Sequence, residues 1–166
     1  MRQRGECLPI EQVLDTVLRV EKDVIGFYRL ARDLAGDDAA KRTFERLLEE
    51  KETNLPDLQK VCREIECDGT ALANATQEDL VFLSALAETS FYRQVGNPAE
   101  LADPALDVQY LVDNALKLEK DLMLFYVKFY GVSCAAHKLL FSKMIQMSQR
   151  QIAELNNTRA RLGATS

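Results

Sequence analysis

One short string occurs twice in this chain, and it constrains the fold more than any other feature. The segment from Glu21 to Tyr28 begins Glu-Lys-Asp and ends Phe-Tyr, and the segment from Glu119 to Tyr126 does the same. The two copies are 98 residues apart (119 − 21). The apolar positions from 44 to 58 also recur from 141 to 155, at an offset of 97 (141 − 44). The repeat of both segments predicts a chain built from two related helix pairs.

Composition agrees with one helical domain over residues 1–166. The chain has 166 residues, 47% apolar and 28% charged, with only 7 glycines and 4 prolines, which favours helix. The net charge is −5 and there is no basic tract, so nucleic acid is not an expected partner. No apolar run approaches the roughly 18 residues of a membrane span. The segment Met1 to Cys7 lacks the apolar region of a signal peptide, so we expect a cytoplasmic protein whose four cysteines are free thiols.

Apolar residues at spacings of three and four predict five helices, at about residues 9–35, 38–66, 76–93, 105–131 and 133–162. The fold class is therefore all-α: a four-helix bundle of duplicated hairpins, with the short helix 76–93 carried on a long crossover. Local signals mark the ends. Gly36-Asp37-Asp38 ends one helix and caps the next, Thr76 begins a capping box, Ser133 is an expected N-cap, and Gly163 is an expected stop. Pro56 predicts a kink inside the second helix.

Six positions in the apolar stripes are polar, and they lie at matching heights in the two halves. The first and third long helices each contribute one glutamate, and the second and fourth each contribute a pair spaced i, i+3. A carboxylate-bridged di-iron site has this arrangement, except that its i, i+3 pairs are Glu-x-x-His. The six residues are Glu21, Lys51, Asn54, Glu119, Ser148 and Gln151.

The chain resembles the rubrerythrin branch of the ferritin-like superfamily over about residues 9–160. The segments 21–28, 44–50, 82–86 and 119–126 carry the resemblance. It implies a di-iron centre that oxidises ferrous iron or reduces peroxide, with Glu21 and Glu119 as ligands. Four of the six expected ligands differ, because Lys51…Asn54 and Ser148…Gln151 stand where the two Glu-x-x-His motifs would be. The paired Cys-x-x-Cys knuckles of full rubrerythrins are missing too.

Two buried carboxylates need compensation, and Lys51 is the candidate to supply it. We hypothesise a Lys-centred polar cluster in place of the metal, with hydrogen bonds from Asn54, Ser148 and Gln151. Tyr28 and Tyr126, each seven residues after its glutamate (28 − 21 and 126 − 119), would extend the network as a second shell if the helices kink or tilt. The alternatives are exposed glutamates and a Lys51 side chain that reaches solvent.

Other titratable residues receive simpler interpretations. Glu49, Glu50 and Glu52 are expected on a solvated face, with an inward-turned Glu50 as the alternative. Cys134 and His137 are one helical turn apart, yet structural metal sites want four ligands, so we expect a buried thiol and a packed or surface histidine. His137 lies 14 residues before Gln151 (151 − 137), about 21 Å along a helix, and so cannot replace a lost ligand.

The sequence leaves three functions open. The first is a non-catalytic binding or scaffolding bundle that has lost its di-iron site and needs no cofactor. The second is a metal-binding oxidoreductase with a reduced iron site at Glu21 and Glu119, so whether the chain is an enzyme stays uncertain. The third is a small-molecule binder that uses the space left by the metals. A homodimer is expected from the resemblance and from surplus apolar residues in the middle helix: Phe82, Leu86, Phe91 and Tyr92.

Overall fold

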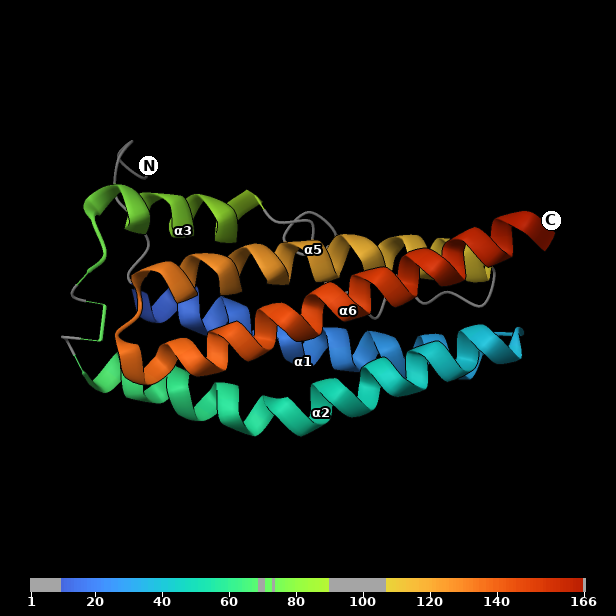
Figure 1. Cartoon of the computed structure of the whole chain (residues 1–166), viewed down its shortest axis with the longest axis horizontal. Helices are drawn as coiled ribbons and strands as arrows, with labels where there is room; N and C mark the ends of the chain where they lie inside the picture. Colours follow the sequence, from blue (N-terminus) through green and yellow to red (C-terminus); the bar gives the residue numbers. More distant parts are fainter. Residues whose placement is uncertain (1–9, 69–70, 73, 90–106, 166) are drawn as a thin grey trace.

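The computed structural model describes residues 10–68, 71–72, 74–89 and 107–165, and it is an all-α bundle (Figure 1). Its described helices are α1 (Ile10–Leu34), α2 (Asp38–Cys67), α3 (Gln77–Thr89), α5 (Val108–Val132) and α6 (Ala135–Thr165). The four long helices form the bundle and α3 is the extra helix, as the periodicity predicts. The predicted end of the short helix at residue 93 lies outside the described residues.

The bundle consists of two antiparallel hairpins, α1–α2 and α5–α6, which face each other (Figure 1). Between the hairpins, α1 contacts α5 and α2 contacts α6, whereas α3 packs outside the bundle against α1 and α5. Because α2 and α5 run in the same direction, the chain must travel back along the bundle between them, and α3 lies on that crossover. This topology is consistent with a ferritin-like four-helix bundle plus one helix.

Side-chain caps set three of the described helix starts, and at one of them Asp107 accepts a hydrogen bond from the Tyr110 amide of α5 at 2.8 Å. The Asp37 carboxylate accepts a hydrogen bond from the Ala40 amide at 2.8 Å and also binds Arg161 of α6. Thr76 and Asp79 form the predicted reciprocal capping box, in which each backbone amide donates to the other side chain at 2.8 and 3.1 Å.

Two of the expected helix ends were wrong. Ser133 is the C-cap of α5, where its amide donates to the Phe129 carbonyl, and α6 begins only at Ala135. Gly163 does not stop α6, which continues to Thr165. The helix α2 is continuous through Pro56.

Aromatic residues pack on the bundle axis and position the polar layer. Phe27 and Tyr28 of α1 lie 6.5 and 5.9 Å from the Phe44 ring of α2, measured between ring centroids. In the other hairpin, Phe129 stacks on Phe141 at 5.4 Å. All five rings are at most 1% exposed, so the layer between them is shielded from water.

The structure describes two of the four apolar residues that we expect to be in surplus in the middle helix, and they differ in exposure. Leu86 packs against the bundle core, whereas Phe82 is 45% exposed and has the Lys128 ammonium 5.3 Å from its ring centroid. Phe91 and Tyr92 lie outside the described residues. Within the described part of the chain, no helix is both long enough and apolar enough to cross a membrane.

Candidate functional site

The six polar stripe residues are all buried in the middle of the bundle. Each is at most 7% exposed, although a lysine and two glutamates are among them. They come from the four long helices: Glu21 from α1, Lys51 and Asn54 from α2, Glu119 from α5, and Ser148 and Gln151 from α6. The bundle thus encloses a polar layer that draws on both hairpins.

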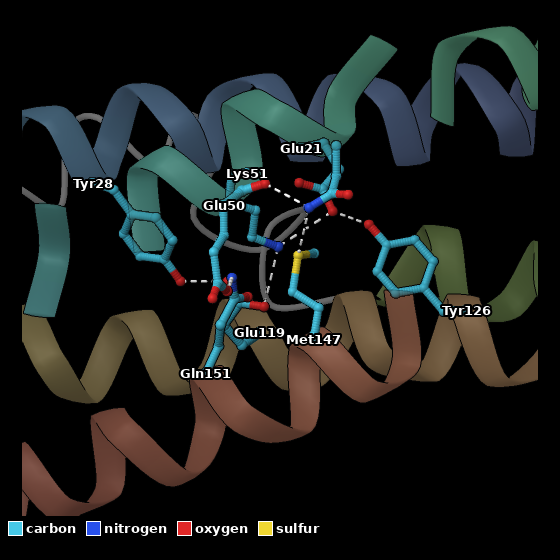
Figure 2. A network of polar contacts seen from close by, with 9 residues as sticks. Glu21, Tyr28, Glu50, Lys51, Glu119, Tyr126, Met147 and Gln151 are labelled. Atoms are coloured by element: carbon cyan, nitrogen blue, oxygen red, sulfur yellow. Dashed lines mark hydrogen bonds and ion pairs between the residues drawn. The ribbon is translucent and has the colours of Figure 1, made fainter. Parts of the chain in front are cut away.

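Lys51 lies between the two glutamates (Figure 2). Its Nζ is 3.2 Å from Glu21 Oε1 and 3.1 Å from Glu119 Oε2, and all three side chains are at most 2% exposed. The ammonium therefore bridges a carboxylate from each half of the chain. With all three groups ionised, the triad carries one net negative charge, shared over two carboxylates.

The two tyrosines bind these carboxylates in a crossed pattern. Tyr28 of α1 donates its hydroxyl to Glu119 Oε1 of α5, and Tyr126 of α5 donates to Glu21 Oε1 of α1. Figure 2 shows the two rings on opposite sides of the cluster. Each tyrosine therefore reaches the glutamate of the other half, so the two tyrosines extend the network across the hairpins. The antiparallel α1–α5 pair makes the two contacts equivalent.

The electrostatics of the cluster follow from its burial. Burial raises the pKa of Glu21; Lys51 opposes that shift and the Glu119 charge adds to it. Burial alone would lower the pKa of Lys51, but the two carboxylates outweigh it and hold that pKa above the ordinary 10.5. Burial and the Glu119 carboxylate raise the pKa of Tyr28 well above 10.0, so this phenol remains a neutral donor.

The two flanking amides bind Glu50 and not the cluster. Within the described structure no hydrogen bond joins Asn54, Ser148 or Gln151 to Lys51 or the two glutamates, so the expectation of such hydrogen bonds was wrong. Asn54 Nδ2 donates to the Glu50 carbonyl at 2.7 Å and contacts Met147 Sδ at 3.2 Å. Gln151 Nε2 donates to Glu50 Oε2 at 2.9 Å. Glu50 is half-buried, so the expectation of a fully solvated Glu50 was wrong. Glu49 and Glu52 are exposed, as expected, and Glu52 pairs with Arg29 at 2.7 Å.

Several buried acceptors and donors in this layer have no partner within the described structure. They are the Asn54 and Gln151 side-chain oxygens and the Ser148 hydroxyl. Lone polar atoms of this kind are uncommon in protein interiors. The layer therefore keeps hydrogen-bonding capacity that the protein itself does not use.

The residues of this layer do not fit a pair of metal ions. A di-iron centre needs carboxylates and imidazoles that converge on the metals. Here a buried ammonium, kept protonated by its raised pKa, occupies the point on which the two glutamates converge. The other positions hold a hydroxyl and two amides, which are weak ligands beside imidazole and carboxylate. No group of three or more His, Cys, Asp or Glu in the described ranges could hold a metal ion.

Sequence reasoning missed three contacts of the layer. Met147 contacts Asn54, Glu50 binds Gln151, and each tyrosine crosses to the opposite half. The sequence did contain a signal for the crossed tyrosine contacts. In both halves the tyrosine follows its glutamate by seven residues, and equal spacing allows reciprocal contacts between two antiparallel helices.

His137 lies far from this layer and is buried, with 6% of its surface exposed. Its Nδ1 is 3.5 Å from Cys134 Sγ and its Nε2 is 3.1 Å from Glu64 Oε2. The histidine is thus packed, as expected, while Cys134 is only half-buried. Cys62, Cys67 and Cys134 are free, and Cys7 lies outside the described residues.

Fold and site together define a class: an all-α bundle, compatible with a ferritin-like fold, that has a carboxylate–lysine–tyrosine cluster on its axis. Comparison with protein-family models, with curated proteins and with solved structures finds no match for this chain. Its function therefore has to be argued from its own residues.

Proposed function

We propose that this chain is a ferritin-like bundle of the rubrerythrin type in which Lys51 replaces the di-iron centre. In this proposal the protein acts as a binding or scaffolding bundle and not through di-iron catalysis. The observation that carries the proposal is the position of Lys51 Nζ, within 3.2 Å of both glutamates. One fixed positive charge there takes over part of what a metal would otherwise do for the two carboxylates, since it offsets one of their two negative charges and orients both.

Three further features support this proposal. The tyrosine hydroxyls donate to the same two carboxylates, Tyr28 to Glu119 Oε1 and Tyr126 to Glu21 Oε1, which leaves fewer lone pairs for a metal. The small Ser148 stands at the position equivalent to Lys51, where a second long side chain would compete for the same space. The ion pairs and tyrosine contacts also join the two hairpins, because their donors and acceptors come from both, and they hold the hairpins in one register.

Metal analysis of a rebuilt site tests the proposal. The protein would be purified after growth with iron and manganese, and its metals measured against protein concentration. We expect less than about 0.1 metal per chain at micromolar protein, as two hard oxygen ligands beside an ammonium bind weakly. The variant K51E/N54H/S148E/Q151H restores both Glu-x-x-His motifs, and it should gain iron.

The matched control exchanges charge outside the layer. Glu49→Lys changes an exposed residue of α2 and should leave the metal content unchanged. About two metals per chain in the unmodified protein would contradict the proposal. About one per chain, lost in Glu119→Gln, would favour an oxidoreductase with a reduced site at Glu21 and Glu119, and peroxide and ferroxidase assays would follow.

We also propose that the protein self-associates through the side of the bundle that carries α3. Phe82 and Val81 of α3 are 45% and 48% exposed, and Leu124 and Val127 of α5 are exposed to a similar degree. A patch of exposed apolar side chains marks a surface to which another protein surface binds. Sedimentation equilibrium should show a dimer that Phe82→Glu weakens, while a monomer at all concentrations would contradict self-association.

A further inference from the structure

Three side chains form a chain of contacts at the end of the bundle where α2 ends and α6 begins (Figure 1). Cys134 Sγ is 3.5 Å from Nδ1 of His137. Nε2 of the same ring is 3.1 Å from Glu64 Oε2. The three residues come from different places: Cys134 precedes the first residue of α6, His137 lies in its first turn, and Glu64 lies in the last turn of α2. A thiol, an imidazole and a carboxylate are thus joined by two successive contacts.

The geometry suits proton transfer and does not suit metal binding. A metal needs ligands that converge on one point, but here the sulfur and the carboxylate lie at opposite nitrogens of the imidazole. A nucleophile, a base within hydrogen-bonding reach and a third group that orients the base form the arrangement of an activated thiol. With Nε2–H donating to Glu64, Nδ1 has its lone pair toward the thiol and can accept the thiol proton.

The base and the carboxylate of this group border an open groove, and the thiol is partly exposed. Cys134 is half-buried, and the groove of about 390 Å³ lies between α2 and α6 beside His137 and Glu64; Cys134 itself is not among its lining residues. Its walls include Val61 and Leu140, with Lys60 and Lys143 also among the lining residues. Cys62 makes a useful contrast, since burial raises the pKa of that thiol to about 12 and it has no such access.

The register of α2 and α6 places a second thiol at the level of Cys134. The contacts Thr43–Thr158, Asn54–Met147 and Glu64–His137 show that each step forward along α2 matches an equal step back along α6. Three residues beyond Glu64 is Cys67, and three residues before His137 is Cys134. Cys67 is exposed, and the Cys134 amide is held by the Ala71 carbonyl at 2.9 Å, just beyond the end of α2.

We propose that Cys134 is a nucleophilic thiol that reacts with small disulfides, with His137 as its general base, Glu64 as the residue that positions His137, and Cys67 as the resolving thiol. Cys134 transfers its proton to His137 Nδ1 and attacks one sulfur of the small disulfide. The S–S bond breaks, the mixed disulfide forms, and the leaving thiolate takes the proton from His137. Cys67 then attacks Cys134 Sγ, so that a Cys67–Cys134 disulfide forms and a second small thiol leaves. Two protein thiols are oxidised and one small disulfide is reduced to two thiols.

Competitive alkylation within one chain tests the first step. Folded protein is treated with limiting iodoacetamide at pH 7, and the modified cysteines are quantified by peptide mass spectrometry. Cys67 serves as the exposed internal reference. We expect Cys134 to react at least about tenfold faster than Cys67, and Cys62 to remain unmodified. His137→Gln introduces an amide that can form hydrogen bonds but cannot take a proton. It should bring the ratio of the Cys134 and Cys67 alkylation rates close to one.

Further variants separate activation from packing. Glu64→Gln should lower the Cys134/Cys67 ratio of alkylation rates in part. Glu49→Gln changes an exposed carboxylate of α2 that does not line the groove, and it should leave this ratio unchanged. Added imidazole should restore the rate in His137→Ala, which a purely structural role of His137 would not allow. Equal rates at Cys134 and Cys67 in the unmodified protein, or an unchanged ratio in folded His137→Gln, would overturn the proposal.

An aromatic disulfide that releases a coloured thiol tests the second step. With 5,5′-dithiobis(2-nitrobenzoate) as the probe, the unmodified protein should release two thiols per reacting Cys134, and mapping should find a Cys67–Cys134 disulfide. Cys67→Ser should release one thiol and retain the mixed disulfide at Cys134. A mixed disulfide that persists in the unmodified protein would overturn the resolving role of Cys67.

Discussion

Lys51 is the residue on which the buried layer depends, because it is the cation shared by Glu21 and Glu119. Lys51→Met keeps the length of the side chain but leaves two carboxylates buried without compensation. We expect the free energy of unfolding to fall by about 3–5 kcal/mol, the range for removing one partner of a buried ion pair. Urea unfolding followed by circular dichroism measures it.

A triple variant is the control for Lys51→Met. K51M/E21Q/E119Q removes the charges together, and the tyrosine hydroxyls can still donate to the new amide oxygens. It should regain most of the lost stability, since a well-packed neutral substitute for a buried ion pair is often as stable as the pair. If Lys51→Met alone unfolds at the same urea concentration as the unmodified protein, Lys51 does not compensate buried charge.

The same layer predicts a loss of stability in alkaline solution. The pKa values of Lys51 and Tyr28 are raised above 10.5 and 10.0 in the folded state, so the folded chain holds these protons more tightly than the unfolded chain. Their contribution is complete below about pH 10 and is lost as the pH rises toward the folded pKa values. Each group adds a slope of about 1.4 kcal/mol per pH unit in that window.

Tyrosine variants isolate one part of that slope. Tyr28→Phe should reduce the fall in the free energy of unfolding between pH 9 and pH 11, measured by urea titration at each pH. Tyr110→Phe removes a tyrosine that is 41% exposed, and its slope should equal that of the unmodified protein. Equal slopes for the two variants would show that Tyr28 is not coupled to folding.

At the residue scale, the sequence predicted the buried positions and the pairing of Lys51 with the two glutamates, but not the other contacts of the layer. Periodicity alone places Glu21, Lys51 and Glu119 on the bundle axis, because each replaces an apolar residue in a stripe. Contacts such as Tyr28–Glu119 depend on how two helices far apart in sequence slide against each other. Glu50 was misplaced for a related reason, since its half-burial comes from Gln151 on α6 and not from its own helix.

At the element scale, Asp37 joins the start of α2 to the end of α6. It caps the Ala40 amide and pairs with Arg161 at 2.7 Å, and the Arg161 guanidinium and this amide lower the pKa of its carboxyl to about 2. We expect stability to decrease in the order unmodified, Asp37→Asn, Asp37→Ala. Asparagine retains the cap and loses the ion pair, whereas alanine loses both.

Thermal unfolding of these Asp37 variants at two pH values measures both parts. The contribution of the ion pair is present above about pH 3.8, the ordinary pKa, and is lost as the pH falls toward 2. The difference in melting temperature between the unmodified protein and Asp37→Asn should therefore become smaller in acid. The difference in melting temperature between Asp37→Asn and Asp37→Ala should persist. If the difference in melting temperature between the unmodified protein and Asp37→Asn is the same at both pH values, the ion pair with Arg161 does not contribute to stability.

Helices were predicted more reliably than their ends. The four ranges predicted for the long helices differ from α1, α2, α5 and α6 by a few residues, because the apolar stripes run the full length of each bundle helix. Ser133 failed as the N-cap of α6 because neighbouring backbone groups decide where α5 ends and α6 begins. The Ser133 amide completes α5 through Phe129, and the next amide, that of Cys134, binds Ala71, so α6 starts later.

At the scale of the whole molecule, the duplication makes the asymmetry of the polar layer informative. The crossed contacts Tyr28–Glu119 and Tyr126–Glu21 show that the two halves face each other in equivalent ways. Lys51 in α2 has Ser148 as its counterpart in α6, at the same offset of 97 as the rest of the hairpin (148 − 51). One lysine thus serves both halves, and a serine leaves it room.

This near-symmetry predicts that the lysine can change sides. Lys51→Ser should lower the free energy of unfolding by about 3–5 kcal/mol, since it leaves both glutamates unpaired. K51S/S148K should recover most of that loss, because a lysine at 148 would approach the same two carboxylates from the opposite hairpin. Such a recovery is an interaction energy between two sites that share partners, and a double-mutant cycle measures it by urea unfolding. A double variant no more stable than Lys51→Ser would show that the halves are not interchangeable at this layer, and that the α2 backbone, and not the pair of glutamates alone, determines where the cation can lie.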